Sequence, residues 1–323
     1  MKKIIIDIYG ADAGAEECLH GVVLAIKQEH IFPGLVGDKA LIDGFMAENG
    51  IGEDAYEVIH TTDYITNDEP PTVVFGGREE SSTVLAYQRL KQDEDCVALL
   101  SAGNTGALLV GAIARLGLLD TVKFPALCSA LPCAGEKLVC LVDCGAIIDC
   151  TEKDLVRFAK MGNVFAKCYC RIDAPRVGLM SVGREAAKGN ALTKKAYELL
   201  SGLYLNFVGK LEGSDVVSGY AEVIVTDGFS GNLLLKNTEA VGKKAMEIVA
   251  NYAKENPALA EAINRELAKT FDFNTRGAAT FLGTKKTVLK MHGCATRETV
   301  LSSVQQITRL TEADFIGHLS KAL

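Results

Sequence analysis

The chain has 323 residues, of which 48% are hydrophobic and 23% are charged, and its formal net charge is −7. These proportions are typical of a globular protein, and the acidic balance excludes the broad basic surface by which proteins bind nucleic acid. The apolar run near the start covers only Ile4 to Ile6, and the longest apolar stretch, from Ala107 to Leu119, is interrupted by Arg115. Neither fits a signal peptide or a membrane span, so we expect a cytoplasmic protein.

The chain contains ten cysteines, and none of them forms a Cys-x-x-Cys pair. Cys140 lies in the apolar run Leu-Val-Cys-Leu-Val, which indicates a buried strand. We therefore expect most of the cysteines to be reduced, small hydrophobic residues. Their spacing fits no set of zinc or iron–sulfur ligands, so no metal is expected.

Short β-branched runs alternate with longer helical patterns, as is typical of an α/β protein with helices on both faces of its sheet. We expect a single α/β unit over residues 1–323, with three α/β/α layers and a mostly parallel sheet, because no repeat or linker interrupts the pattern. The strand candidates, in chain order, are Lys3–Ile8, Gly34–Gly37, Tyr56–His60, Cys96–Leu100, Leu127–Leu131, Leu138–Val142, Val177–Val182, Leu205–Val208, Val223–Thr226 and Val288–Met291.

Helices are predicted in the gaps between these strands. Thr151 is a candidate N-cap because Asp154 follows three residues later, which is the spacing of a capping box. Thr193 similarly precedes a helical pattern over Lys194–Leu200.

The segment from Asn237 to Phe271 is helical in pattern, contains no strand candidate and is divided at Pro257. We expect it to form a protruding helical arm of two helices. Beyond the proline, apolar residues recur at every fourth position, and we expect this stripe to face protein rather than a membrane. The stripe consists of Leu259, Ile263, Leu267 and Phe271.

A polar loop rich in glycine follows the strand candidate that ends at Leu100 and precedes a helix predicted over Ala107–Leu116. Glycine lets the backbone approach a ligand closely, and the N-terminus of a helix favours an anion. The loop matches no dinucleotide fingerprint, so a dehydrogenase is not supported, and a simple tight turn would explain the same residues. The candidate binding residues are Ser101, Gly103, Asn104, Thr105 and Gly106.

Two further loops, Gly183–Asn190 and Asp227–Asn232, also lie between a strand candidate and a helix. Ligands of open α/β sheets bind at the carboxyl ends of the strands, and cations there would make a phosphate site within an acidic protein. The alternative is that the charges are solvated loop residues. The candidates are Lys188, Gly189 and Asn190 in the first loop, and Asp227, Gly228, Ser230, Gly231 and Asn232 in the second.

Asp143 and His292 are single polar residues that directly follow strand candidates. Asp143 could act as a base or orient a cation, or it could cap the next turn. His292 could transfer a proton near neutral pH, or it could be structural.

Together these segments resemble, in the same order along almost the whole chain, the phosphate acyltransferases of bacterial phospholipid synthesis, a family often called PlsX. The stretch Ser101–Ala107 has the family's sequence Ser-Ala-Gly-Asn-Thr-Gly-Ala, and Asp7 to Asp12 is similar to its opening Asp-Ala-Met-Gly-Gly-Asp. The other similar segments are Val36–Asp38, Asp68–Pro70, Ser81–Ser82, Asp143–Ala146, Met161–Gly162, Pro175–Leu179, Lys188–Asn190, Asp227–Asn232 and His292–Gly293. The departures from the family pattern include Ala11, Ala13, Ala15, Ile147 and Arg184.

The resemblance implies acyl transfer from an acyl-[acyl carrier protein] to inorganic phosphate, giving acyl phosphate and free carrier protein. It also implies a fold similar to that of the isocitrate and isopropylmalate dehydrogenases and the phosphate acetyltransferases, a homodimer, and no metal or nicotinamide cofactor. The arm is shorter and more polar than the family's membrane-docking tip, so peripheral membrane contact is the less favoured alternative.

Phosphate is itself a nucleophile, so the site has to hold it beside the thioester and stabilise the oxyanion. We expect Lys188 and the Ser101–Gly106 loop to hold phosphate, and Asn232 to polarise the carbonyl. Asp227, Asp143 and His292 are candidates for orientation or for proton transfer to the leaving thiolate. We further expect the Ser101–Gly106 and Asp227–Asn232 loops to converge on one pocket, with Lys188 at its rim.

Other readings stay open at this point. A related subunit of glycine-reductase-type complexes forms acetyl phosphate through a cysteine thioester, and Cys294 could be such a nucleophile. A non-catalytic protein that binds a carrier protein could keep the same fold. Coenzyme A could also replace the carrier protein as the acyl donor's thiol.

Overall fold

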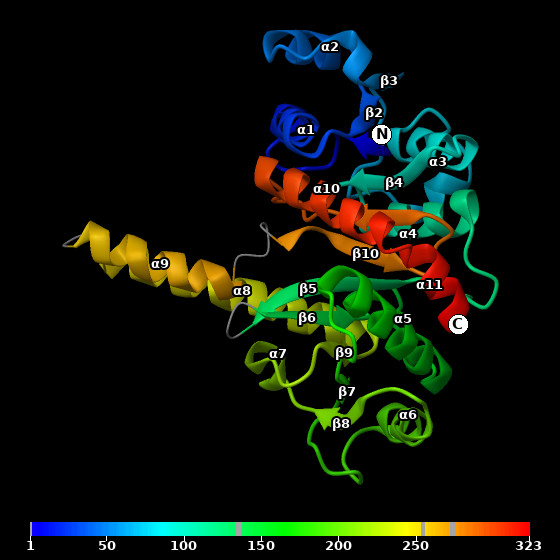
Figure 1. Cartoon of the computed structure of the whole chain (residues 1–323), viewed down its shortest axis with the longest axis vertical. Coiled ribbons are helices and arrows are strands. Elements are labelled where there is room, and N and C mark those ends of the chain that lie inside the picture. The colour runs from blue at the N-terminus through cyan, green and yellow to red at the C-terminus, as the bar shows by residue number, and fades with distance from the viewer. Residues whose placement is uncertain (1, 134–136, 253–255, 272–275) are drawn as a thin grey trace. The chain divides into compact units, whose positions relative to one another are not determined.

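The structure is a computed structural model that describes residues 2–133, 137–252, 256–271 and 276–323. Its contacts divide the chain into two compact units (Figure 1): unit 1 comprises residues 1–125 and 277–321, and unit 2 comprises residues 126–276 and 322–323. No linker marks this division in the sequence, and unit 1 is assembled from two stretches that flank unit 2. The expectation of a single α/β catalytic unit over residues 1–323 stays a prediction.

Unit 1 contains the strands β1 (Lys3–Asp7), β2 (Phe32–Gly37), β3 (Glu57–His60), β4 (Cys96–Ser101), β10 (Ala279–Leu282) and β11 (Thr287–Lys290). Their order in the sheet is β3-β2-β1-β4-β11-β10. β10 is antiparallel to β11, and the other neighbouring pairs are parallel. β10 is not among the strands predicted from the sequence.

The helices of unit 1 are α1 (Ala15–Glu29), α2 (Lys39–Glu48), α3 (Ser82–Gln92), α4 (Thr105–Gly111), α10 (Arg297–Glu312) and α11 (Phe315–Ala322), and the short helices are η1 (Glu53–Ala55), η2 (Pro71–Phe75) and η3 (Ala112–Leu116). Ile4 and Ile6 of β1 share one apolar core with α1 and α10. Gly21 lets these two helices approach closely, since a Cβ there would lie 2.5 Å from Val300 Cβ. The helix predicted over 107–116 begins earlier, at Thr105, and its last part, η3, is a π-helix.

Unit 2 contains the strands β5 (Ala126–Cys133), β6 (Lys137–Val142), β7 (Val177–Met180), β8 (Phe207–Leu211) and β9 (Val223–Val225). Their order is β5-β6-β9-β7-β8, with β5 antiparallel to β6 and the remaining pairs parallel. The prediction of a mostly parallel α/β fold is therefore confirmed. β7 is shorter than predicted, and β8 lies further along the chain than Leu205–Val208.

The helices α5 (Glu152–Cys170), α6 (Ala191–Ser201) and α7 (Asp215–Ser218) also belong to unit 2. The capping box of α5 is confirmed, with Thr151 as the N-cap and Asp154 as its partner. The prediction of Thr193 as an N-cap is wrong, because α6 begins earlier and Asn190 caps it by accepting a 2.8 Å bond from Thr193 N.

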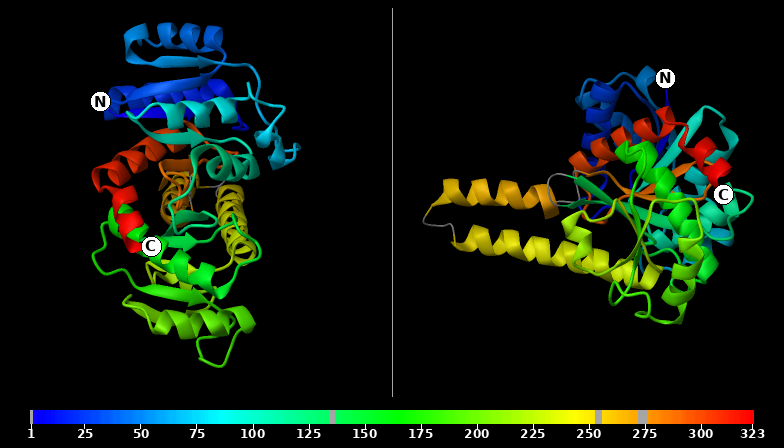
Figure 2. Two further views of the ribbon diagram at one scale, coloured as in Figure 1. Left: turned by 90° about the vertical axis from the view of Figure 1, so that its right-hand side faces the viewer. Right: turned by 60° about the horizontal axis from the view of Figure 1, so that its bottom comes forward.

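The helical arm is formed by α8 (Gly228–Tyr252) and α9 (Pro257–Phe271), which lie side by side and extend away from the sheet of unit 2 (Figure 2). The prediction of two helices is confirmed. The apolar stripe faces protein only in part: Phe271 packs against Gly242 of α8, whereas Leu259 is 55% and Ile263 is 40% exposed. Leu259 and Ile263 are therefore not covered by the rest of this chain, and packing of the stripe on a second subunit stays a prediction.

The arm begins earlier than predicted, because α8 includes the segment from Gly228 to Asn232 that the sequence analysis assigned to a loop. Within the described ranges, no helix is both long enough and apolar enough to cross a membrane.

Candidate functional site

In unit 1 the carboxyl ends of the parallel strands β1, β4 and β11 carry Asp7, Ser101 and Lys290. Ser101 Oγ donates a hydrogen bond to Asp7 Oδ2 at 3.0 Å and accepts one from Gly103 N at 3.0 Å. Asp7 and Ser101 are both buried. The Ser101 hydroxyl therefore shapes its own loop, and in this conformation it is not exposed to a ligand.

Asn104 is likewise committed to the fold. Its Oδ1 caps α4 by accepting a 3.0 Å bond from Ala107 N, and its Nδ2 donates to Thr66 O at 3.0 Å. Thr105 and Gly106 form the first turn of α4 and are half-buried. The side chains of Ser101 and Asn104 are therefore used by the fold in this conformation, and anion binding by this loop stays a prediction.

Two neighbouring loops, which follow β1 and β11, lie against the loop that follows β4. Gly10 has φ +92°, and a Cβ there would lie 2.5 Å from Gly103 Cα, so only glycine permits the approach. Asp12 N donates to Gly293 O at 2.7 Å, and Lys290 Nζ donates to Ala102 O at 3.0 Å. The loops that begin near residues 8, 102 and 291 therefore meet at one edge of the unit 1 sheet.

His292 and Cys294 lie on the third of these loops, and both side chains are exposed. Cys294 Sγ is 3.0 Å from His292 Nδ1, and Cys294 N also donates to His292 Nδ1 at 3.2 Å. The proposed role of His292 in proton transfer stays a prediction, and so does the reactivity of Cys294.

In unit 2 Asp143 directly follows β6 and is fully buried. Its Oδ1 accepts from the backbone N–H groups of Leu127, Gly145 and Ala146 at 2.9, 3.1 and 3.0 Å, and its Oδ2 accepts from Ile147 N at 2.6 Å. Burial raises the pKa of Asp143, and these backbone bonds oppose the rise. The carboxylate organises the loop after β6, and both of its oxygens are occupied.

The start of α8 packs directly on that loop. Asp227 acts as the N-cap, with its Oδ1 accepting from Ser230 N at 2.8 Å. Glycine is required at two positions, because a Cβ at Gly228 would lie 2.5 Å from Ile147 O and one at Gly231 would lie 1.9 Å from Asp143 O. Asn232 follows with an exposed side chain that lies over Gly145. The structure thus brings Asp143 and the Asp227–Asn232 segment together.

Lys188 lies on the loop after β7, and its side chain is exposed. Gly189 has φ +104°, and Asn190 is the N-cap of α6, so the predicted trio directly precedes the N-terminus of an 11-residue helix. β7 is a parallel neighbour of β9, so the loop with Lys188 and the start of α8 follow the same edge of the unit 2 sheet. Convergence of these residues with the Ser101–Gly106 loop would join two units, and it stays a prediction.

Two buried charged groups at these edges, Asp7 and Lys210, are not among the site residues predicted from the sequence. Asp7 was part of a quoted motif, and its position at the end of the first strand was the available signal. Lys210 lies in β8 but beyond Val208, where the strand was predicted to end.

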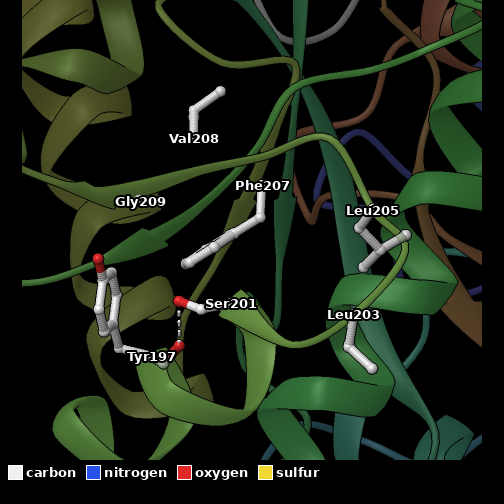
Figure 3. A pocket seen from close by; sticks show the side chains of 7 residues that line it. All are labelled: Tyr197, Ser201, Leu203, Leu205, Phe207, Val208 and Gly209. Carbon is white, nitrogen blue, oxygen red and sulfur yellow. Dashed lines mark hydrogen bonds between the residues drawn. The ribbon is translucent and has the colours of Figure 1, made fainter.

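A pocket of about 370 Å³ lies at the other end of β8, where the strand begins (Figure 3). Its wall contains the rings of Tyr197 and Phe207 and the hydroxyl of Ser201, which donates to Tyr197 O at 2.8 Å. No charged side chain lines it, so it does not have the chemistry of a phosphate site.

Comparison with known proteins shows the family to which this chain belongs. The model of a family described as "Fatty acid synthesis protein" matches residues 2–318. The chain belongs to this family. It is 35% identical to a phosphate acyltransferase of Thermoanaerobacterium thermosaccharolyticum, covering 99% of this chain and 96% of that protein. It is 36% identical to a phosphate acyltransferase of Helicobacter pylori, covering 100% of this chain and 95% of the relative.

Solved structures show the same fold at low sequence identity. A phosphotransacetylase from Streptococcus pyogenes has a TM-score of 0.66 and 16% identity, covering 96% of this chain and 94% of that one. A branched-chain phosphotransacylase from Enterococcus faecalis has a TM-score of 0.61 and 17% identity, covering 96% and 98%. A likeness to isocitrate and isopropylmalate dehydrogenases in particular stays a prediction.

Proposed function

We propose that this protein transfers an acyl group from a thioester to inorganic phosphate, producing an acyl phosphate for fatty acid and phospholipid metabolism. The observation that carries the proposal is identity of 35% and 36%, over nearly the full length of both chains, to proteins named phosphate acyltransferase. The fold shared with a phosphotransacetylase is consistent with the same reaction class. The names of these relatives do not favour the cysteine-thioester or non-catalytic alternatives.

In the proposed reaction a phosphate oxygen attacks the thioester carbonyl carbon, and the carbon–sulfur bond of the tetrahedral intermediate then breaks. The attacking phosphate loses its proton, the thiolate departs with the electron pair of the carbon–sulfur bond, and the thiolate takes up a proton to become the free thiol. Phosphate needs no activation by a protein nucleophile, so the protein contributes positioning and charge stabilisation.

We assign the phosphate to Lys188 and the N-terminus of α6. Lys188 is an exposed cation two residues before Asn190, which caps that helix. The partial positive charge of the helix start would add to the charge of the ammonium group. Within an acidic protein this combination gives an anion a local attraction without a basic surface.

Asn232 is proposed to donate a hydrogen bond to the carbonyl oxygen as it becomes an oxyanion. Its amide is exposed in the second turn of α8, and Asp227 and Asp143 hold the helix start and the loop beneath it. His292 is proposed to supply the proton to the leaving thiol. The acyl donor is proposed to be carried by acyl carrier protein or by coenzyme A, and the active form is proposed to be a cytoplasmic homodimer.

The test is production of acyl phosphate from a panel of acyl thioesters and phosphate, with hydroxylamine used to trap the product. We expect Lys188→Ala to raise the KM for phosphate at least tenfold while the thermal unfolding temperature stays unchanged. Lys195→Ala, which removes an exposed lysine from α6, is the matched control. It should leave the KM for phosphate and the KM for the thioester unchanged. Absence of acyl phosphate with every thioester would overturn the proposed reaction, and unchanged phosphate kinetics would overturn the role of Lys188.

A further inference from the structure

The loop that carries Lys188 has almost no apolar anchoring of its own. Every residue from Arg184 to Lys188 is exposed, and Gly183 is the buried residue at its start. Exposed loops of this kind are normally mobile, because few contacts offset the conformational entropy of the chain. A lysine that has to meet a small anion would be poorly placed on such a loop unless other groups held its backbone.

Lys210 holds that backbone from beneath. It lies on β8, its side chain is buried, and its residue is 2% exposed. Its Nζ donates to Ala186 O and to Lys188 O, each at 2.6 Å. The ammonium group also lies 4.9 Å from the centroid of the Tyr197 ring, which comes from α6.

Such burial is costly for an ammonium group unless its donors are used, and lysine is rarely buried without a partner. Among the described residues, no carboxylate forms an ion pair with Lys210. Its ammonium group instead donates to two carbonyl groups of one loop and lies near one aromatic ring. Carbonyl oxygens and aromatic faces both attract a positive charge. The contacts are therefore specific for the conformation of the loop.

A second link fixes the beginning of the loop. Arg184 pairs with the buried carboxylate of Asp215, and the Arg184 guanidinium lies 4.8 Å from the centroid of the Tyr220 ring. Asp215 Oδ2 in turn accepts a 2.8 Å bond from Glu212 N. With one end tied through Arg184, Lys210 acts at the other end, at the backbone of Lys188 itself.

We propose that Lys210 is a positioning residue for phosphate: it fixes the backbone at Ala186 and Lys188 and thereby aims the Lys188 ammonium at the anion. This inference rests on the proposed function, in which Lys188 contacts phosphate. Lys210 itself does not touch the reacting atoms. Misplacement of a substrate-binding group by about 1 Å can reduce a rate on the order of 10²-fold. Loss of the contact between Lys210 and this backbone is therefore expected to reduce the rate measurably.

The test compares Lys210→Met with Lys210→Arg. Methionine keeps the apolar stem but removes the ammonium donors, whereas arginine keeps a cation that can donate to both carbonyls. We expect Lys210→Met to raise the KM for phosphate at least tenfold, to leave the KM for the thioester within about twofold, and to speed hydrogen exchange of the amides in residues 184–189. Lys210→Arg should restore at least part of the phosphate affinity.

Lys286→Met is the matched control, because Lys286 Nζ in unit 1 also donates to two carbonyls, Leu90 O at 2.9 Å and Asp93 O at 2.7 Å. It should lower the thermal unfolding temperature without changing the KM for phosphate. If Lys210→Met does not fold, Lys210→Gln takes its place, with a shorter neutral donor.

The double variant Lys188→Ala/Lys210→Met separates the two proposals. If Lys210 acts through Lys188, the double variant should have the same phosphate KM as Lys188→Ala alone. Multiplied effects, or unchanged hydrogen exchange in residues 184–189, would overturn the positioning role of Lys210. Normal phosphate kinetics of Lys188→Ala, together with faster exchange in Lys210→Met, would instead overturn the proposed phosphate site and leave the backbone contact standing.

Discussion

Each unit buries one aspartate at the carboxyl end of a parallel strand, and the two carboxyl groups are held differently. Asp7 closes β1 and Asp143 follows β6; their exposed fractions are 1% and 0%. Asp143 accepts bonds from the backbone N–H groups of four residues, Leu127, Gly145, Ala146 and Ile147. Asp7 accepts a backbone bond from Tyr9 N at 3.2 Å and a hydroxyl bond from Ser101 at 3.0 Å.

The difference shows that the hydrogen-bond donors around a buried carboxyl group decide what that group can do. Backbone N–H groups only donate, so Asp143 has to present acceptors on both oxygens. A hydroxyl group can reorient to donate or accept, so the partner of Asp7 tolerates a protonated or neutral side chain. Burial raises the pKa of Asp7 to about 6, close to neutral pH. The loop after β6 is thus held by acceptors on both oxygens of Asp143, even though burial raises the pKa of this group, whereas the surroundings of Asp7 suit either protonation state.

The largest expected effect is that of Asp143→Asn. The amide presents one oxygen instead of two, so at least one buried backbone N–H and the new amide N–H groups lack acceptors. At about 1–3 kcal/mol for each unsatisfied group, we expect a loss of roughly 4 kcal/mol in the free energy of unfolding. Urea unfolding followed by circular dichroism measures the loss. An unchanged midpoint would show that the loop after β6 does not depend on the charge.

Asp7→Asn should act in the opposite direction at neutral pH. The pKa of Asp7 rises from 3.8 to about 6 on folding, so the folded chain binds this proton more tightly. The favourable contribution is complete below about pH 4 and is lost as the pH rises through about 6. Removing the ionisable group should therefore stabilise the protein by up to about 3 kcal/mol at pH 7 and by nothing at pH 4.

The measurement is the difference in urea unfolding between wild type and Asp7→Asn from pH 4 to pH 7.5. Taking the difference removes the contributions of carboxylates with lowered pKa, such as Glu17 and Asp93, whose pKa values are each about 2. A difference that does not vary with pH would mean that Asp7 does not titrate in this range.

Gly231→Ala tests the loop after β6 through its backbone contact with α8. A Cβ at this position would lie 1.9 Å from Asp143 O, so the start of α8 has to move away from the loop that Asp143 organises. We expect a loss of about 2 kcal/mol in stability and a loss of acyl phosphate production, because Asn232 moves with the helix. Gly44→Ala in α2 is the control: nothing lies within 4 Å of its Cβ position, and it should gain about 0.5–1 kcal/mol.

The smallest effect is expected from Ser101→Ala. It removes the hydroxyl that donates to Asp7 and accepts from Gly103 N, at a cost of about 1 kcal/mol. Because Asp7 then has one donor fewer, its pKa should rise further, and the pH-dependent part of stability should move to higher pH. The same titration of unfolding free energy checks this. A shift to lower pH would contradict the role given to the Ser101 hydroxyl.

Some features of the fold could be predicted from local sequence alone. The Thr151–Asp154 capping box, the strands around β1, β4 and β6, and the division of the arm near Pro257 rest on neighbours within a few residues. Glycine at positions 228 and 231 was expected to serve a ligand. In the structure these glycines permit close packing of α8 on the loop after β6, and their role in ligand binding stays a prediction.

The alternation of strands and helices, the mostly parallel sheet and the polar loops at strand ends could be predicted from residue order, because they follow from periodicity and capping over short distances. The polar side chains that the fold itself uses became evident from the three-dimensional contacts. Ser101, Asn104 and Asp143 find their partners in the fold, while Lys188 and Asn232 remain exposed. Ser101 and Asp7 are 94 positions apart, and Lys210 lies 22 positions from Lys188. Such pairings depend on strand order and register, and no local pattern of residue types specifies them.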